Sequence, residues 1–249
     1  MRTLAVNLGN TSLFGGVFSD DKLIRQFRVP INKATRSTDL IRDRVDRVVI
    51  CSVVPKLTKK ISAFLGRKFE IVPQLLTAEA PHGLKSGYRE PRQLGTDRIA
   101  AALGARKLFP RQNCIVIDCG TATTVTALGK DGTVLGGAIF PGAGLWSEML
   151  TSRTAQLPAA KLRRPAKALG RSTESALESG LFHGHTGAIR ELVAHIRAEA
   201  FRRSEVAVIG TGGHAGHFAK EKIFDVLEPA LVLIGLNEFS MRLQQAQGL

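Results

Sequence analysis

The chain has 249 residues, of which 44% are hydrophobic and 22% charged. These proportions are typical of globular domains and exclude disordered and fibrous classes, and no apolar run reaches the roughly 20 residues of a membrane-spanning helix. The net charge of +14 is compatible with nucleic acid, an acidic membrane surface or an anionic small molecule. The basic residues are dispersed and only 6% of residues are aromatic, so we expect neither a nucleic-acid nor a membrane partner.

The cysteines and the N-terminus bear on the compartment. Cys51, Cys114 and Cys119 are odd in number and lie in apolar segments, which predicts buried thiols in a reducing compartment rather than a disulfide framework or a metal site. The N-terminus passes straight into a strand-like run and lacks the layout of a signal peptide. We therefore expect a cytoplasmic protein.

The first half of the chain alternates strand-like and helix-like segments. A short apolar run over residues 3–9 ends on glycine, and a hairpin with a turn at residues 19–22 follows it. Further strands are predicted at residues 48–51 and 69–72, with a helix between them that opens on Pro55 and continues to about Leu65. This alternation predicts an α/β fold.

At Cys114 the pattern starts again. A second apolar run ends Asp118-Cys119-Gly120, and strands at residues 124–128 and 133–139 follow it. Asn7–Ser12 aligns with Asp118–Thr123, which indicates an internal duplication. A late strand is predicted at 207–210 and a closing helix at 229–245. We therefore predict two similar domains, residues 1–112 and 113–249.

The two strand ends suit the binding of phosphate. Glycine after a strand lets backbone N–H groups approach an anion, and a carboxylate beside it can hold a cation or its water. A single copy is also common turn chemistry. Two copies at matching places predict two loops that face each other across a central cleft and hold the phosphates of ATP.

Two further segments have both a structural and a functional interpretation. In Ile209–His214 a buried strand runs into glycines, which suits either a tight turn or backbone lying against a nucleotide. In Gly95–Arg98, which precedes an alanine-rich helix, Thr96 or Asp97 could simply cap that helix. The functional alternative makes Asp97 a general base for a hydroxyl that attacks a γ-phosphate, with Arg98 binding an anion.

These elements, in this order, resemble the type III pantothenate kinases of the acetate and sugar kinase/Hsp70/actin superfamily. The resemblance spans nearly the whole chain and is most specific where Asp118–Thr124 is followed by Gly136–Gly142; the other matching segments are Leu8–Thr11, Gly95–Arg98 and Thr211–Ala215. It implies duplicated ribonuclease H-like (actin-like ATPase) domains. It also implies ATP-dependent phosphorylation of pantothenate, the first step of coenzyme A synthesis, by a cytoplasmic homodimer that uses Mg²⁺ and a monovalent cation, K⁺ or NH₄⁺.

The resemblance also implies roles for individual residues. Asp97 resembles the catalytic proton acceptor, and Asp118 resembles the monovalent-cation ligand. The implied pantothenate contacts are Tyr88, Gly95, Thr96, Asp97, Arg98 and Thr173. The implied ATP contacts are Asn7, Leu8, Gly9, Asn10, Thr11, Ser12, Leu13, Phe14, Thr121, Gly212 and Gly213.

One residue departs from the family pattern, which has aspartate where this chain has Asn7. An amide carries no charge with which to hold hydrated Mg²⁺, so catalysis should be weakened. The alternative function is therefore a weakened or inactive relative that acts as a regulatory or accessory binding protein. The retained Asp97, Arg98 and Asp118 favour the enzyme.

Overall fold

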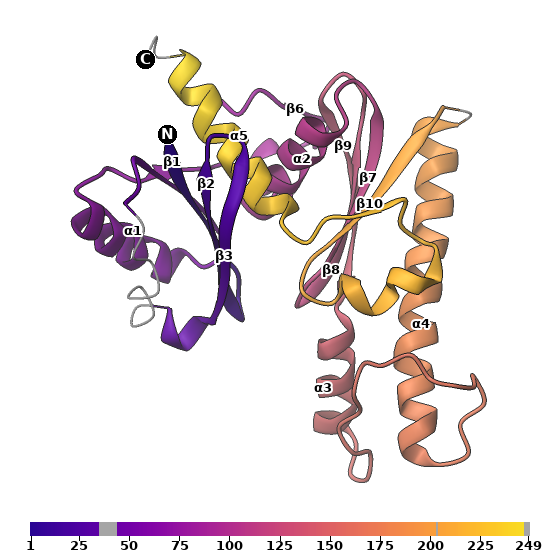
Figure 1. The fold of residues 1–249 in the computed structure, drawn as a ribbon. Helices are drawn as coiled ribbons and strands as arrows, with labels where there is room; N and C mark the ends of the chain where they lie inside the picture. The colour runs from indigo at the N-terminus through magenta and orange to yellow at the C-terminus, as the bar shows by residue number, and fades with distance from the viewer. Residues whose placement is uncertain (35–43, 203, 247–249) are drawn as a thin grey trace. The chain divides into compact units, whose positions relative to one another are not determined.

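The computed structural model describes residues 1–34, 44–202 and 204–246. The chain divides into two compact units (Figure 1). Unit 1 comprises residues 1–110, 132–134 and 230–249, and unit 2 comprises residues 111–131 and 135–229. The chain thus passes from unit 1 to unit 2 at Pro110 and returns at Ala230, so the predicted domain 113–249 contains residues of both.

Unit 1 is built on a five-stranded sheet with the order β3-β2-β1-β4-β5. The strands are β1 (Arg2–Leu8), β2 (Ser12–Ser19), β3 (Lys22–Pro30), β4 (Arg47–Ser52) and β5 (Gln74–Leu75). β1 pairs antiparallel with β2 and parallel with β4. This arrangement brings the ends of β1 and β4 to one edge of the sheet.

Helices cover both faces of this sheet (Figure 1). On one face, Leu4, Val6 and Leu8 pack with Ile61 and Leu65 of α1 (Pro55–Phe69). The other face is covered by α2 (Thr96–Leu108) and α5 (Leu231–Ala246), which also pack against each other. Side chains alternate along a strand, so Asn7 lies on the face of α2 and α5. The contact of Leu233 in α5 with Gly16, which pairs with Ala5, confirms this face.

Unit 2 repeats the same strand order. The sheet reads β11-β10-β7-β8-β9-β6, and β7 pairs antiparallel with β8 and parallel with β10. Its strands are β7 (Asn113–Cys119), β8 (Ala122–Leu128), β9 (Thr133–Pro141), β10 (Val206–Thr211) and β11 (Val226–Leu227). β6 (Lys85–Ser86) pairs with residues 133 and 134 at the start of β9, and these four residues belong to unit 1.

The duplication predicted from the sequence is confirmed by this topology. Strands β3-β2-β1-β4-β5 correspond in order to β9-β8-β7-β10-β11, and Asn7 and Asp118 occupy the same place in their sheets. Asn7 pairs with Phe14 and Cys51, whereas Asp118 pairs with Thr124 and Thr211. The two strand ends therefore have the same backbone but different chemistry around it.

The helices of unit 2 pack on the second sheet. They are α3 (Ala143–Arg153) and α4 (Thr173–Ile196), and α4 buries Phe182 and Ile189 against β7 and β8 residues. The shorter helical turns among the described residues are η1 (Ile31–Lys33), η3 (Pro91–Gln93), η4 (Arg197–Phe201) and η5 (Ala215–Glu221). None of the helices in the described ranges has the length and apolarity to cross a bilayer.

One predicted strand is wrong. Residues 69–72 were expected to form a strand, but α1 extends to Phe69 and ends on Glu70 in the left-handed conformation (φ 56°). The apolar side chains that suggested the strand, Phe69 and Ile71, instead pack against the α1 side of the core. The strand that pairs with β4 on the side away from β1 is the short β5, which begins immediately after Pro73.

The prediction that the three cysteines are buried thiols is confirmed. Cys51, Cys114 and Cys119 are buried, and none forms a disulfide. Burial, together with the neighbouring Asp118 carboxylate, raises the pKa of the Cys119 thiol to about 12. This thiol therefore stays protonated and packs as a small apolar side chain.

Candidate active site

The turn after β1 forms a compact loop. The Gly9 N–H donates to the Ser12 carbonyl at 3.0 Å, and the Ile31 N–H donates to the Thr11 carbonyl at 2.9 Å. A Cβ at Gly9 would lie 3.3 Å from the Ser12 oxygen, so a side chain there would crowd the turn. The loop therefore holds its backbone in a fixed shape at the end of β1, as the predicted phosphate loop requires.

Asn7 has a defined hydrogen bond at this strand end. The Cys51 thiol donates to Asn7 Oδ1, with 3.3 Å between sulfur and oxygen. Cys51 is buried, whereas Asn7 is half-buried. Nδ2 of Asn7 has no hydrogen-bond partner within residues 1–34, 44–202 and 204–246.

The start of α2 is tied to the end of β4 by Thr96. Its hydroxyl donates to the Ser52 carbonyl at 3.0 Å and accepts from the Ser52 N–H at 3.2 Å. The interpretation of Thr96 or Asp97 as a helix cap is wrong, because the N-cap residue is Gly95 and no side chain caps the helix. Thr96 instead fixes where the first turn of α2 lies on the sheet.

Asp97 occupies that first turn. Its Oδ1 accepts from the Arg98 N–H at 2.8 Å, and a Cβ at Gly95 would lie 2.7 Å from the same oxygen. Burial raises the pKa of the Asp97 carboxyl above its ordinary value, and the Arg98 N–H and charge offset this in part. A carboxylate with a raised pKa is a better proton acceptor than an exposed one.

Arg98 and Tyr88 form the side of the site next to Asp97. Arg98 is buried, and its Nη1 donates to the Tyr88 hydroxyl. The guanidinium carbon lies 5.5 Å from the centre of the Tyr88 ring. A buried positive charge held beside a carboxylate and a phenol is suited to an anionic substrate that carries a hydroxyl group.

In unit 2, glycines pack against the end of β7. Gly212 has φ of 90°, and a Cβ there would overlap Asp118 Oδ1 and lie 2.8 Å from backbone atoms of Cys119. The His214 N–H donates to the Cys119 carbonyl at 2.9 Å. The glycine-rich turn after β10 is thus required for the backbone to lie directly on the Asp118 strand end.

Thr121 and Thr173 lie in different parts of unit 2. Thr121 is exposed, and its carbonyl accepts from the Gly142 N–H at 2.9 Å. Thr173 is the first residue of α4 and lies within the capping box formed by Ser172 and Ser175. It lines an apolar groove of about 530 Å³ between α3 and α4 with Trp146 and Leu177.

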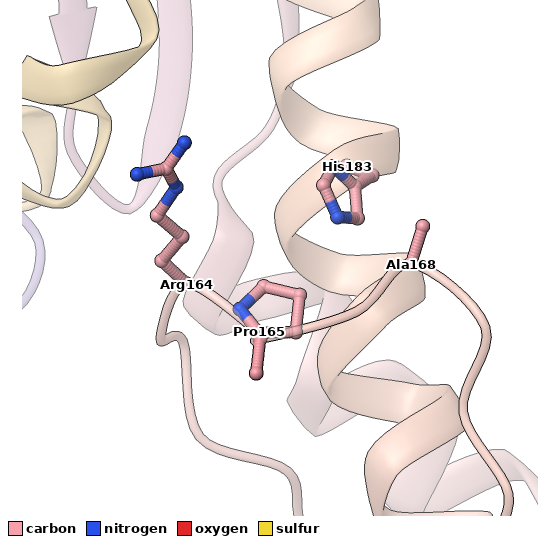
Figure 2. Close-up of a pocket in the computed structure, with 5 residues that line it drawn as sticks. Arg164, Pro165, Ala168 and His183 are labelled. Atoms are coloured by element: carbon pink, nitrogen blue, oxygen red, sulfur yellow. The ribbon is translucent and has the colours of Figure 1, made fainter.

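A second pocket in unit 2 contains none of the predicted site residues. Figure 2 shows it between the segment that contains Arg164 and Ala168 and the helix that carries His183. Its volume is about 540 Å³. Arg164 is a basic side chain at this pocket, and it forms an ion pair with Glu221 at 3.0 Å.

Comparison with known proteins decides the family. A model of the family described as type III pantothenate kinase matches residues 3–195. A type III pantothenate kinase of Legionella pneumophila (strain Paris) is 36% identical over 250 residues, covering 96% of this chain and 98% of that protein. Type III pantothenate kinase 1 of Francisella tularensis subsp. holarctica (strain OSU18) is 37% identical over 248 residues, covering 94% of this chain and 96% of that protein. The chain belongs to the type III pantothenate kinase family.

Solved structures support the fold of this family member. A Campylobacter jejuni protein assigned to the Baf family of transcriptional activators superposes with a TM-score of 0.65 at 19% identity, covering 99% of this chain and 100% of that one. The activator of 2-hydroxyisocaproyl-CoA dehydratase from Clostridium difficile, with bound ADPNP, gives a TM-score of 0.51 at 12% identity, covering 100% of this chain and 98% of that one. The predicted fold class, duplicated α/β units of the actin-like ATPase kind, is confirmed.

His185 is a buried polar residue in this type III pantothenate kinase that sequence reasoning missed. It lies on α4, and its Nε2 is 3.0 Å from Oγ1 of Thr123, which directly follows the Asp118–Ala122 turn. The ring stacks on Phe218 and meets the edge of Trp146, and Nδ1 has no hydrogen-bond partner in the described part of the chain. A histidine within an apolar helix face gives no signal of this contact in one sequence.

We expect His185 to make the kinase sensitive to acid. Burial, with the nearby His214, lowers the pKa of His185 from 6.5 to about 4. Between pH 6.5 and about 4 the unfolded chain binds a proton that the folded chain excludes, so the free energy of unfolding falls by about 3 kcal/mol over this window.

Denaturant unfolding at pH 7 and pH 4.5 measures this effect. The wild type should lose more stability on acidification than His185→Gln does, and His195→Gln, at an exposed position, serves as the control. An equal loss in the wild type and His185→Gln would contradict the assignment, as would a His185 ring that titrates by NMR near pH 6.5.

Proposed function

We propose that this protein transfers the γ-phosphoryl group of ATP to the hydroxyl of pantothenate, forming 4'-phosphopantothenate in the first step of coenzyme A synthesis. The observation that carries the proposal is Asp97, a carboxylate of raised pKa at the start of α2 beside the buried Arg98. Family membership supports the substrate. The alternative, a non-catalytic relative, is not favoured.

The chemistry needs one proton acceptor. The pantothenate hydroxyl oxygen bonds to the γ-phosphorus while the bond from that phosphorus to the β,γ-bridging oxygen breaks, and ADP leaves. The hydroxyl proton passes to Asp97. The raised pKa of Asp97 makes this transfer more favourable than transfer to an exposed aspartate.

The substrate contacts proposed in unit 1 lie around Asp97. Arg98 offers its charge to the pantothenate carboxylate or to the transferring phosphoryl, and Tyr88 orients the guanidinium. Gly95 leaves room beside the carboxylate. The Thr96 hydroxyl is hydrogen-bonded to both the N–H and the carbonyl of Ser52, so we propose that it positions the first turn of α2. Thr173, in unit 2, remains a proposed contact from the resemblance.

The two strand-end loops are proposed to hold the nucleotide. In unit 1 these are Asn7–Phe14, and in unit 2 they are Thr121 and the glycines Gly212 and Gly213. What supports the proposal is the matching strand order of the two sheets and the close contact of Gly212 with the β7 end. Such turns present backbone N–H groups to phosphate oxygens.

The monovalent cation and Mg²⁺ are proposed to bind in different ways. A carboxylate at a strand end fits a monovalent cation, so we propose Asp118 as the ligand of K⁺ or NH₄⁺. The described residues contain no group of three acidic, histidine or cysteine side chains that could hold a metal ion. Unit 1 supplies an amide at the equivalent position, which does not fit Mg²⁺; we propose that Mg²⁺ arrives as the MgATP complex, bound by the phosphates themselves.

We further propose a cytoplasmic homodimer that binds neither nucleic acid nor membranes. The three buried thiols fit a reducing compartment. The apolar groove between α3 and α4, lined in part by Leu150, which is 39% exposed, is the surface that best suits a second copy.

A phosphorylation assay tests the function. The purified chain, with ATP, Mg²⁺ and K⁺, should convert pantothenate into a product 80 Da heavier by mass spectrometry, which is the mass of one added phosphate group. Absence of turnover, not restored in Asn7→Asp, would favour the non-catalytic alternative. Nucleic-acid binding that weakens steeply with salt would then support an accessory role.

A further inference from the structure

The turn between β7 and β8 is tied to α4 by a buried hydrogen bond. Thr123, which pairs with Cys119 across the base of this turn, is fully buried, and its Oγ1 lies 3.0 Å from Nε2 of His185. Inside the turn, the Gly120 N–H donates to the Ala122 carbonyl at 3.1 Å. His185 therefore fixes the residue at which the turn rejoins the sheet.

A second segment packs on the same turn. The Gly142 N–H donates to the Thr121 carbonyl at 2.9 Å, and a Cβ at Gly142 would lie 2.5 Å from that oxygen. Phe140 and Trp146 flank Gly142 in the chain. Both pack against the His185 ring, with ring centres 5.1 and 5.4 Å from it. One imidazole thus contacts the turn directly and also contacts the segment that packs on it.

Histidine lowers the stability of the fold at this position. The His185 ring is fully buried and also stacks on Phe218, and its Nδ1 has no hydrogen-bond partner among the residues that the structure describes. A buried polar atom without a partner lowers the free energy of unfolding, whereas phenylalanine would bring no such atom among these three aromatic rings. What the imidazole supplies, and phenylalanine does not, is the hydrogen bond to Thr123.

We propose that His185 is a positioning residue for the nucleotide site, because through Thr123 it holds the β7–β8 turn in the shape that binds ATP. The proposal rests on the proposed function, in which this turn supplies Thr121 to the nucleotide. The proposed pantothenate contacts lie in unit 1, except for Thr173. Loss of the hydrogen bond should therefore weaken the binding of ATP and leave the binding of pantothenate unchanged.

Titration calorimetry with MgATP in a K⁺ buffer, on the full chain, tests the proposal. Thr123→Val removes the hydroxyl and keeps the shape of the side chain, and it should raise the Kd for ATP about fivefold, the effect of one hydrogen bond. His185→Phe should raise the Kd equally and should unfold at no lower temperature than the wild type. The double variant should bind no more weakly than either single variant, because both substitutions remove the same bond.

Matched variants separate positioning from a general loss of packing. Thr123→Ser keeps the hydroxyl and should bind ATP like the wild type, and so should His185→Gln, because an amide can take the place of Nε2. Thr186→Val removes a neighbouring buried hydroxyl that has no hydrogen-bond partner in the described part of α4 or around it, and it should leave the Kd unchanged. If the larger ring of His185→Phe destabilises the fold, the comparison of Thr123→Val with Thr123→Ser decides.

Steady-state kinetics give a second readout that a merely structural role would not produce. Thr123→Val should raise the KM for ATP about fivefold and change the KM for pantothenate by less than about twofold. A loss of folded protein would instead lower the apparent kcat and leave both KM values unchanged.

Three results would overturn the proposal. They are wild-type ATP affinity in Thr123→Val, equal losses in Thr123→Val and Thr186→Val, and additive losses in the double variant. The expected pattern of ATP affinities without pantothenate-dependent turnover would overturn the proposed function alone. Absence of ATP binding by the wild type would overturn both.

Discussion

Asp97→Asn is expected to lower kcat for pantothenate phosphorylation by about a thousandfold, within the range that a positioned general base contributes. The amide cannot accept the hydroxyl proton, although it keeps the size of the side chain. The substrates should still bind, so the KM for ATP should change by less than about threefold. Steady-state kinetics with a coupled ADP assay measure both quantities.

The pH profile adds a second readout for Asp97. Since burial raises its pKa, the wild-type rate should fall with acid at a pH above the ordinary value of 3.8 for aspartate. The residual rate of Asp97→Asn should lack that acid limb. Glu70→Gln, an exposed carboxylate at the end of α1, is the control and should retain full activity. Wild-type rates in Asp97→Asn would remove Asp97 from the mechanism.

Gly235→Ala is expected to cost about 3 kcal/mol of unfolding free energy, because it overfills a close helix contact. α5 crosses α2 with almost no space between the backbones. A Cβ at Gly235 would overlap the Ala100 carbonyl oxygen and lie 2.7 Å from the Gly104 nitrogen. These neighbours are backbone atoms of a buried helix, so they cannot turn aside as a side chain would. Chemical denaturation followed by circular dichroism measures the loss.

The same substitution at another helical glycine provides the control. Gly187 lies on the exposed side of α4, and a Cβ there would meet no atom within 4 Å. Gly187→Ala should therefore stabilise by up to about 1 kcal/mol, since alanine is the better helix former. A similar effect of the two substitutions would show that helix propensity, and not the α2–α5 contact, governs Gly235.

The strand framework was predictable because apolar runs and strand-end glycines are local signals. The similarity of Asn7–Ser12 to Asp118–Thr123 was detectable in the sequence alone, and the two sheets share the corresponding strand order. The strand predicted at residues 69–72 was wrong because Phe69 and Ile71 are apolar for another reason. They complete the packing of α1, which no short window of sequence distinguishes from a buried strand.

Contacts that join distant segments could not be predicted. The thiol of Cys51 on Asn7 and the bonds of Thr96 to Ser52 both span 44 residues, and His185 reaches Thr123 across 62. Each joins residues whose types suggest no mutual attraction in the sequence. For Asp97 the residue type and helix position were predicted, whereas its raised pKa depends on burial that only the folded chain provides.

The return of the chain to unit 1 has a consequence for biogenesis. α2, which carries Asp97 in its first turn, is buried from Arg98 to Ala105, and α5, which packs on it, is synthesised after unit 2. While the ribosome synthesises residues 111–229, α2 stays uncovered, with an apolar surface that chaperones and proteases recognise. Unit 2 is contiguous apart from three residues, so it can mature first. Deletion of residues 231–246 should therefore destabilise unit 1, which contains Asp97, although most of unit 1 is encoded before unit 2.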